Sequence, residues 1–239
     1  MELSNRLQAV ADLLDYHEAI ADIGCDHGFV SIYLIESKKA SKVLAMDVNK
    51  GPLERAREHV SEKRLSTYIE TRLSDGAKAI RFVPDEEGSL KLEVEAALIA
   101  GMGGRLTIQI IKDSLDKFKS MEEFVLQPQS EISKVRQFVR EIGYHIEKEN
   151  MILEDGKFYP MMKVKSGSSN PYTQVELRYG RELLMQKHPI LKIFLEKEMQ
   201  TKEMIRGNLE SESGEHIENR KRELQEELLL VKEALKVYL

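Results

Sequence analysis

The sequence predicts an α/β protein in which a Rossmann-like doubly wound sheet ends in an antiparallel hairpin and is followed by a C-terminal helical coiled-coil hairpin. Three observations support this. Short apolar runs alternate with helical patterns between residues 19 and 142, two strand-like runs joined by a tight turn follow, and the remainder has only helical periodicity. Strands separated by helices of this length imply a parallel sheet covered on both faces.

The elements of the predicted sheet follow one another in a regular order. A helix capped by Ser4 is expected to reach Leu14, since apolar residues recur there at helical spacing. The predicted strands are 19–23, 43–46, 68–72, 96–100 and 124–126. The predicted helices that follow strands are 29–36, 52–62, one from the glycine turn at 101–104 to about residue 115, and 131–142.

The last two strands and the C-terminal part do not follow this alternation of strands and helices. Segments 144–153 and 158–164 flank the turn at 154–157 and predict a β-hairpin. The linker-like stretch 166–171 divides the chain into residues 1–165 and 166–239. Beyond it, Pro189 begins a helix that ends at the break 211–214, and a second helix carries a coiled-coil seam. Two antiparallel helices are the simplest arrangement.

Composition excludes several classes of protein. With 41% hydrophobic and 32% charged residues, the 239-residue chain is typical of globular proteins, and a net charge of −5 argues against coating nucleic acid through bulk charge. Cys25 is the only cysteine, so no intramolecular disulfide forms, and no ligand cluster predicts a metal. Without an apolar stretch long enough for a membrane span or a signal sequence, we expect a cytoplasmic protein.

The most informative motif runs from Asp22 to Gly28, where a strand meets a helix. Glycines there let the backbone approach a ligand, and the helix start offers free N–H groups. The motif lacks the full G-x-G-x-x-G pattern, which counts against NAD. Asp47 ends the next strand, where a carboxylate can accept hydrogen bonds from ribose hydroxyls. The alternative is that Asp47 is a solvated carboxylate at the end of a strand, with no ligand.

Three further motifs follow the later strands. Asp75, in the segment Ser74-Asp75-Gly76, can accept a hydrogen bond from an adenine amino group or form a plain Asx turn. Three glycines surround Met102 in the segment 101–104, where they either allow backbone contact with a ligand and an entering base or make a tight turn. The Gln127 amide is placed to bind a base. Cys25 and His27 are more simply explained by packing.

Taken in order, these motifs and the helical pair resemble those of the bacterial tRNA (adenine(22)-N1)-methyltransferases over essentially the whole chain. An antiparallel terminal hairpin is also typical of class I methyltransferases, to which that family belongs. One departure is Gly28-Phe29 after Asp26-His27, where the family often has alanine and an aromatic residue. Glycine at that position is nearer the general methyltransferase pattern.

The resemblance implies methyl transfer from S-adenosylmethionine to N1 of an adenosine in the D-arm of tRNA, at position 22, with S-adenosylhomocysteine as product. Because N1 has a free lone pair, catalysis would consist mostly of positioning and electrostatics. We expect Asp26, Met102 and Gln127 to act on the target base, with a helix N-cap as the alternative for Asp26. The expected cofactor-binding residues are Asp22, Gly24, Cys25, His27, Gly28, Asp47, Val48, Ser74, Asp75, Gly76, Gly101 and Gly103.

Since N1 lies on the Watson–Crick edge, the target must turn out of its helix into the pocket. Neither part of the chain is basic overall, so tRNA binding requires a local patch of basic side chains. The candidates for this patch are Arg6, Arg105, Lys134, Arg136 and Arg140. Both a monomer and a self-associating chain remain open. The competing hypotheses are a methyltransferase of another RNA or of a small molecule or protein, and a non-catalytic nucleotide-binding coiled-coil module.

Overall fold

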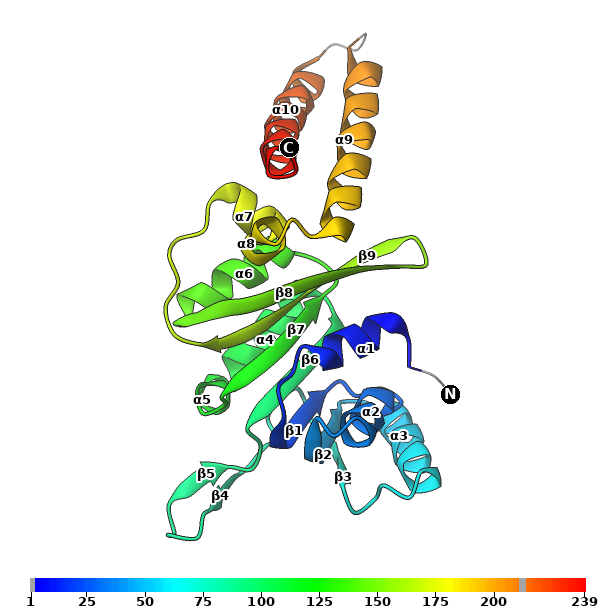
Figure 1. Cartoon of the computed structure of the whole chain (residues 1–239), viewed down its shortest axis with the longest axis vertical. Coiled ribbons are helices and arrows are strands. Elements are labelled where there is room, and N and C mark those ends of the chain that lie inside the picture. The colour runs from blue at the N-terminus through cyan, green and yellow to red at the C-terminus, as the bar shows by residue number, and fades with distance from the viewer. Residues whose placement is uncertain (1–2, 211–213) are drawn as a thin grey trace.

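The computed structural model describes residues 3–210 and 214–239. Its main sheet has the strand order β3-β2-β1-β6-β7-β9-β8 (Figure 1). The strands are β1 (His17–Ile23), β2 (Ala40–Asp47), β3 (Ile69–Leu73), β6 (Ala96–Met102), β7 (Glu123–Pro128), β8 (Tyr144–Glu154) and β9 (Lys157–Ser166). β9 runs antiparallel to both β7 and β8, whereas the other pairs are parallel. The predicted sheet with an antiparallel terminal hairpin is confirmed.

Helices cover both faces of this sheet. One apolar cluster packs the sheet against α1 (Asn5–Asp12), α2 (Phe29–Glu36) and α3 (Lys50–Glu62). The other packs it against α4 (Gly104–Asp113), α5 (Leu115–Lys119) and α6 (Ile132–Glu141). The central strands are apolar on both sides because each face is covered, as in other doubly wound sheets. As predicted, the Ser4 hydroxyl caps α1 by accepting a hydrogen bond from the Leu7 N–H at 3.3 Å.

The order of the strands reverses between β1 and β6. From β1 the chain moves outward to β2 and β3, then returns to the other side of β1 and continues through β6 and β7. Open sheets bind ligands at the carboxyl ends of the strands, in the crevice where the order reverses. The predicted motifs at 22–28, 47, 74–76, 101–104 and 127 all lie at that edge of the sheet.

A small second sheet was not predicted from the sequence. β4 (Phe82–Pro84) pairs with β5 (Leu90–Leu92) as an antiparallel hairpin that projects from the main sheet (Figure 1). Each strand has only three residues, and most of their side chains are exposed. Apolar periodicity cannot indicate a strand that is too short to show it.

The described residues of the C-terminal part form four helices. They are α7 (Gln174–Tyr179), α8 (Arg181–Met185), α9 (Pro189–Leu209) and α10 (Glu215–Lys236). The expected antiparallel pair is α9 and α10, which stands out from the sheet (Figure 1). In α9 the fully buried residues lie near the sheet. Leu191 and Leu195 are fully buried, whereas Leu209 at the far end is only partly buried. Of the predicted helix break at 211–214, residues 211–213 lie outside the described residues, and Gly214 is the N-cap of α10.

The helical part is anchored to the sheet domain by a buried ion pair. Arg136 of α6 donates through Nε to Glu149 of β8 at 2.8 Å, and both side chains are 1% exposed. Its Nη1 also donates to the carbonyls of Leu177 and Arg178 in α7, at 2.8 and 3.0 Å. Arg136 therefore fastens α7 to the sheet domain and, contrary to our expectation, is not available to grip tRNA.

Within the described residues, no helix is both long enough and apolar enough to span a membrane.

Candidate active site

A cavity of about 500 Å³ lies at the carboxyl edge of the sheet. Its volume is within the range of cofactor pockets. Twelve of the predicted site residues line it: Asp22, Gly24, Cys25, Asp26, His27, Asp47, Val48, Ser74, Asp75, Gly76, Gly101 and Met102. Gly28, Gly103 and Gln127 do not. Motifs from four parts of the chain thus meet in one cavity.

The loop between β1 and α2 forms the floor of the cavity. Gly24 has a φ of +80°, and a Cβ at this position would overlap with the Met102 side chain. Because Gly24 has no Cβ, the Met102 side chain can pack directly against the loop backbone. Gly28, with a φ of +75°, begins α2, and its missing Cβ allows close packing on Ala56 of α3. Gly28 shapes the loop without facing the cavity, and Asp26 is not the N-cap of α2.

Asp47, at the end of β2, organises the same loop. Its Oδ2 accepts a hydrogen bond from the Asp26 N–H at 3.2 Å, and its Oδ1 accepts one from the Asn49 N–H at 2.8 Å. Only 9% of the residue is exposed, yet it lines the cavity. Each carboxylate oxygen has a second lone pair. Asp47 is therefore held rigidly and can still accept hydrogen bonds from a ligand.

Asp22 and Cys25 lie deeper. Burial raises the pKa of Asp22 to about 6, although the hydroxyl of Ser31 donates to its Oδ2 at 2.6 Å and so opposes that shift. Burial also raises the pKa of the Cys25 thiol, with nearby carboxylates adding to the effect. Cys25 therefore stays protonated and serves as a small packing residue.

The Ser74-Asp75-Gly76 turn closes the cavity beside β3. The Ser74 hydroxyl donates to the Gly76 carbonyl at 2.7 Å and accepts a hydrogen bond from the Ala79 N–H at 3.1 Å, so it holds the turn together. The Asp75 side chain is 68% exposed and forms an ion pair with Lys78. Asp75 is the residue of this turn whose carboxylate is open to a ligand.

Gln127 lies beneath the cavity. Its side chain is fully buried, and its Oε1 accepts hydrogen bonds from Arg6 Nη1 at 2.8 Å and from the Gly101 N–H at 3.1 Å. The amide therefore positions the glycine turn and Arg6. Gly103 is the N-cap of α4 and lies behind that turn.

Several lining residues were missing from the site predicted by sequence. Leu106 and Ile110 of α4 line the cavity together with Val48, which is 59% exposed there. The side chains of Arg6 of α1 and Gln129 both lie close to Gly101. Helical periodicity places Leu106 and Ile110 on one face of α4, which is a usable signal. Arg6 was expected only as a candidate tRNA contact, and no motif marks Gln129.

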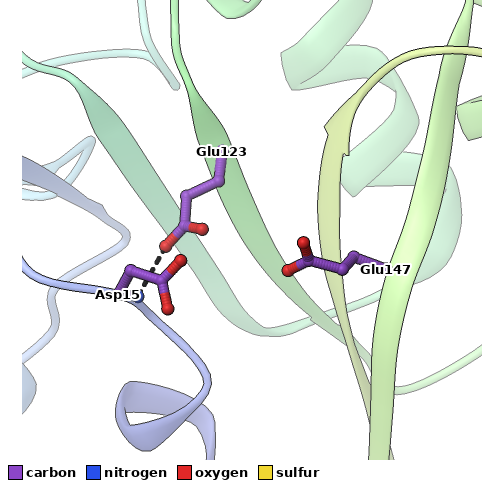
Figure 2. A group of neighbouring side chains, drawn as sticks. All are labelled: Asp15, Glu123 and Glu147. Atoms are coloured by element: carbon purple, nitrogen blue, oxygen red, sulfur yellow. Dashed lines mark hydrogen bonds between the residues drawn. The ribbon is translucent and has the colours of Figure 1, made fainter.

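The opposite edge of the sheet carries a group of three carboxylates, from Asp15, Glu123 and Glu147 (Figure 2). Their oxygens lie within 4.8 Å of one another. Lys163 Nζ is 2.6 Å from Asp15 and 2.9 Å from Glu123, and Lys165 Nζ is 3.2 Å from Glu147. Each of the three carboxylates is thus already paired with an ammonium group, and this cluster is a structural ion-pair network.

The chain is similar to several known proteins. The model of the family described as tRNA (adenine(22)-N(1))-methyltransferase matches residues 20–233. The tRNA (adenine(22)-N(1))-methyltransferase of Bacillus subtilis (strain 168) is 32% identical over 181 residues, which are 75% of this chain and 72% of that protein. Streptococcus pneumoniae Sp1610 in complex with S-adenosyl-L-methionine has a TM-score of 0.83 at 27% identity, covering 98% of this chain and 100% of that one. M. capricolum TrmK in complex with S-adenosyl-homocysteine has a TM-score of 0.82 at 26% identity, covering 99% of each chain.

Proposed function

This chain belongs to the tRNA (adenine(22)-N(1))-methyltransferase family, and on that premise we propose which groups of its pocket bind S-adenosylmethionine and which receive the adenosine. The chain is an S-adenosylmethionine-dependent enzyme that methylates N1 of adenosine 22 in the D-arm of tRNA. One observation carries the assignment of the site. The glycine loop after β1, the Asp47 carboxylate and the glycine turn after β6 all line a single cavity.

The nucleoside end of the cofactor is assigned to the side of the cavity near β2 and β3. Asp47 accepts hydrogen bonds from the ribose hydroxyls, because its carboxylate is fixed by two backbone N–H groups. The adenine packs between Val48 and the α4 residues Leu106 and Ile110. Asp75 accepts a hydrogen bond from the exocyclic amino group.

The methionine end of the cofactor is assigned to the loop from Asp22 to His27. Gly24 leaves room for close approach of the backbone, and Met102 lies directly against it. Bound S-adenosylmethionine supplies an electrophilic methyl group on a positively charged sulfur. Carboxylates at Asp22 and Asp26 favour that positive charge, and Asp22 acts more strongly because it is buried, where the effective dielectric is low.

The target adenine enters beside the glycine turn, between Arg6 and Gln129. Its N1 lone pair attacks directly, so no base has to remove a proton first, and the product base carries a positive charge. We assign Asp26 to stabilising that charge, because its side chain is 71% exposed at the cavity and is not used as a helix cap. Met102 shapes the floor, and Gln127 positions Arg6 and Gly101.

The remaining assignments follow from the substrate. We assign residues 1–165 to the methyltransferase domain and residues 166–239 to the helical part. A tRNA substrate supports the proposal of a cytoplasmic location.

The test is methyl transfer to a defined transcript. Wild-type protein is incubated with S-adenosylmethionine labelled in the methyl group and a tRNA transcript carrying adenosine 22, and the RNA is digested to nucleosides. We expect labelled 1-methyladenosine, and none from a matched transcript with guanosine at that position. Label in both transcripts would reassign the target position. Cofactor binding without label in any RNA would favour a small-molecule or protein substrate, and absence of all transfer would favour the non-catalytic module.

A further inference from the structure

A second hollow, of about 310 Å³, lies beside the catalytic cavity. It is formed where the end of β7 faces the start of β9, and Gln129 lines both cavities. The two spaces are therefore neighbours that share a wall. A polymer whose reactive unit enters the catalytic cavity beside Gly101 can place an adjoining unit at this wall.

Tyr159 and Lys157 give the hollow the chemistry of a nucleotide site. The Tyr159 side chain is partly buried, and its hydroxyl makes no hydrogen bond to any described residue. Lys157 is exposed and forms no ion pair within the described part of the chain. An aromatic ring stacks on any nucleobase, and an unpaired ammonium group attracts a backbone phosphate.

Arg6 connects the two cavities. Its guanidinium lies 5.3 Å from the centroid of the Tyr159 ring and donates to Gln127 at 2.8 Å, while the residue lines the catalytic cavity. Its backbone N–H also donates to Glu154 of β8 at 3.2 Å. The ring and the guanidinium are thus fixed by three separate elements, α1, β7 and the β8–β9 hairpin. Such preorganisation lowers the entropic cost of ordering a ligand.

We propose that this hollow is a second nucleotide subsite, in which Tyr159 stacks on the base next to the target adenosine and Lys157 pairs with a phosphate. This inference rests on the proposed function, because it takes RNA as the polymer that occupies both cavities. The Gln129 side chain, which makes no hydrogen bond to described residues, is placed to bind the sugar or phosphate between the two nucleotides. Holding the neighbouring base in a stack keeps the target turned out of its helix.

The experiment measures binding of a fluorescent tRNA transcript to the full chain by anisotropy, alongside methyl transfer to the same transcript. Tyr159→Ala is expected to weaken tRNA binding about tenfold or more and to raise KM for tRNA, with the Kd for S-adenosylmethionine unchanged. Tyr159→Phe keeps the stacking face, so it should bind within twofold of wild type. Lys157→Ala should weaken binding severalfold and lower the slope of log Kd against log salt by about one.

Two matched variants serve as controls. Tyr68→Ala removes an exposed tyrosine beside β3, and Lys42→Ala removes an exposed lysine from β2, both away from the hollow. Neither should alter tRNA binding. An abasic residue on one side of the target should weaken binding by wild type but add little in Tyr159→Ala, since the stacking partner is already gone.

The outcomes separate this inference from the proposed function. Equal tRNA binding by wild type and Tyr159→Ala, with methyl transfer intact, would overturn the subsite alone. Weaker binding by Tyr159→Ala in a protein that transfers no methyl group would support the subsite and overturn the proposed reaction. A wild-type chain that does not bind tRNA would overturn both.

Discussion

Replacement of Asp47 tests the assignment of the cofactor site most directly. In Asp47→Ala the carboxylate that faces the cavity is lost, and the N–H groups of Asp26 and Asn49 lose the acceptor that holds the loop. Each charge-assisted hydrogen bond contributes roughly 1.5–3 kcal/mol, so the loss of two ribose contacts, partly replaced by water, costs about 2–4 kcal/mol. At about 1.4 kcal/mol for each tenfold change, the Kd for S-adenosylmethionine should rise roughly 30- to 700-fold.

The assay is isothermal titration calorimetry with S-adenosylmethionine and, separately, S-adenosylhomocysteine. Both ligands carry the same ribose, so both should lose affinity to the same extent. Asp47→Asn keeps the shape and one neutral acceptor and should weaken binding about tenfold. Asp116→Ala, which removes an exposed carboxylate on α5, is the control and should bind as wild type does. An unchanged Kd in folded Asp47→Ala would refute the ribose assignment.

Three further predictions concern charge. Burial raises the pKa of Asp22 to about 6, so between about pH 4 and 6 the native protein keeps a proton that the unfolded chain has released. The free energy of unfolding should therefore fall by about 3 kcal/mol as pH rises through this range. Denaturant titrations of Asp22→Asn should lack this slope, and an unaltered slope would contradict the assignment. Asp26→Asn should lower kcat about tenfold while leaving the Kd for S-adenosylmethionine within threefold; equal kcat values would remove Asp26 from catalysis. Arg136→Ala leaves Glu149 buried without a counter-ion, so the free energy of unfolding measured in urea should fall by about 3–5 kcal/mol. A loss below about 1 kcal/mol would argue against a stabilising buried ion pair.

Local patterns were sufficient to predict the sheet and the position of the site along it. The alternation of apolar and helical segments predicted each strand of the main sheet, because strand and helix periodicities differ enough to separate them. The strand-end motifs were placed correctly at one edge for a related reason, since parallel strands bring their carboxyl ends together.

These patterns could not predict the direction in which a side chain points. Gln127 was expected to face the base, but it points under the glycine turn and bonds to Arg6, 121 residues earlier in the chain. Arg136 was expected on the RNA-binding surface, but it is buried against Glu149 and the carbonyls of α7. In both cases the partner comes from a distant segment, and sequence spacing carries no information about such partners.

The sequence by itself determined the fold class, the edge of the sheet that holds the ligand and the family resemblance, because these depend on periodicity and on glycines and carboxylates at strand ends. Only the tertiary structure decided which of those residues face the cavity and which support it from behind. It also decided that Arg6 and Gln129 lie close to Gly101 and that Arg6 packs on the Tyr159 ring. The physical reason is that long-range packing fixes side-chain direction. Residues far apart in the chain become one site only when the helices and strands that carry them are packed together.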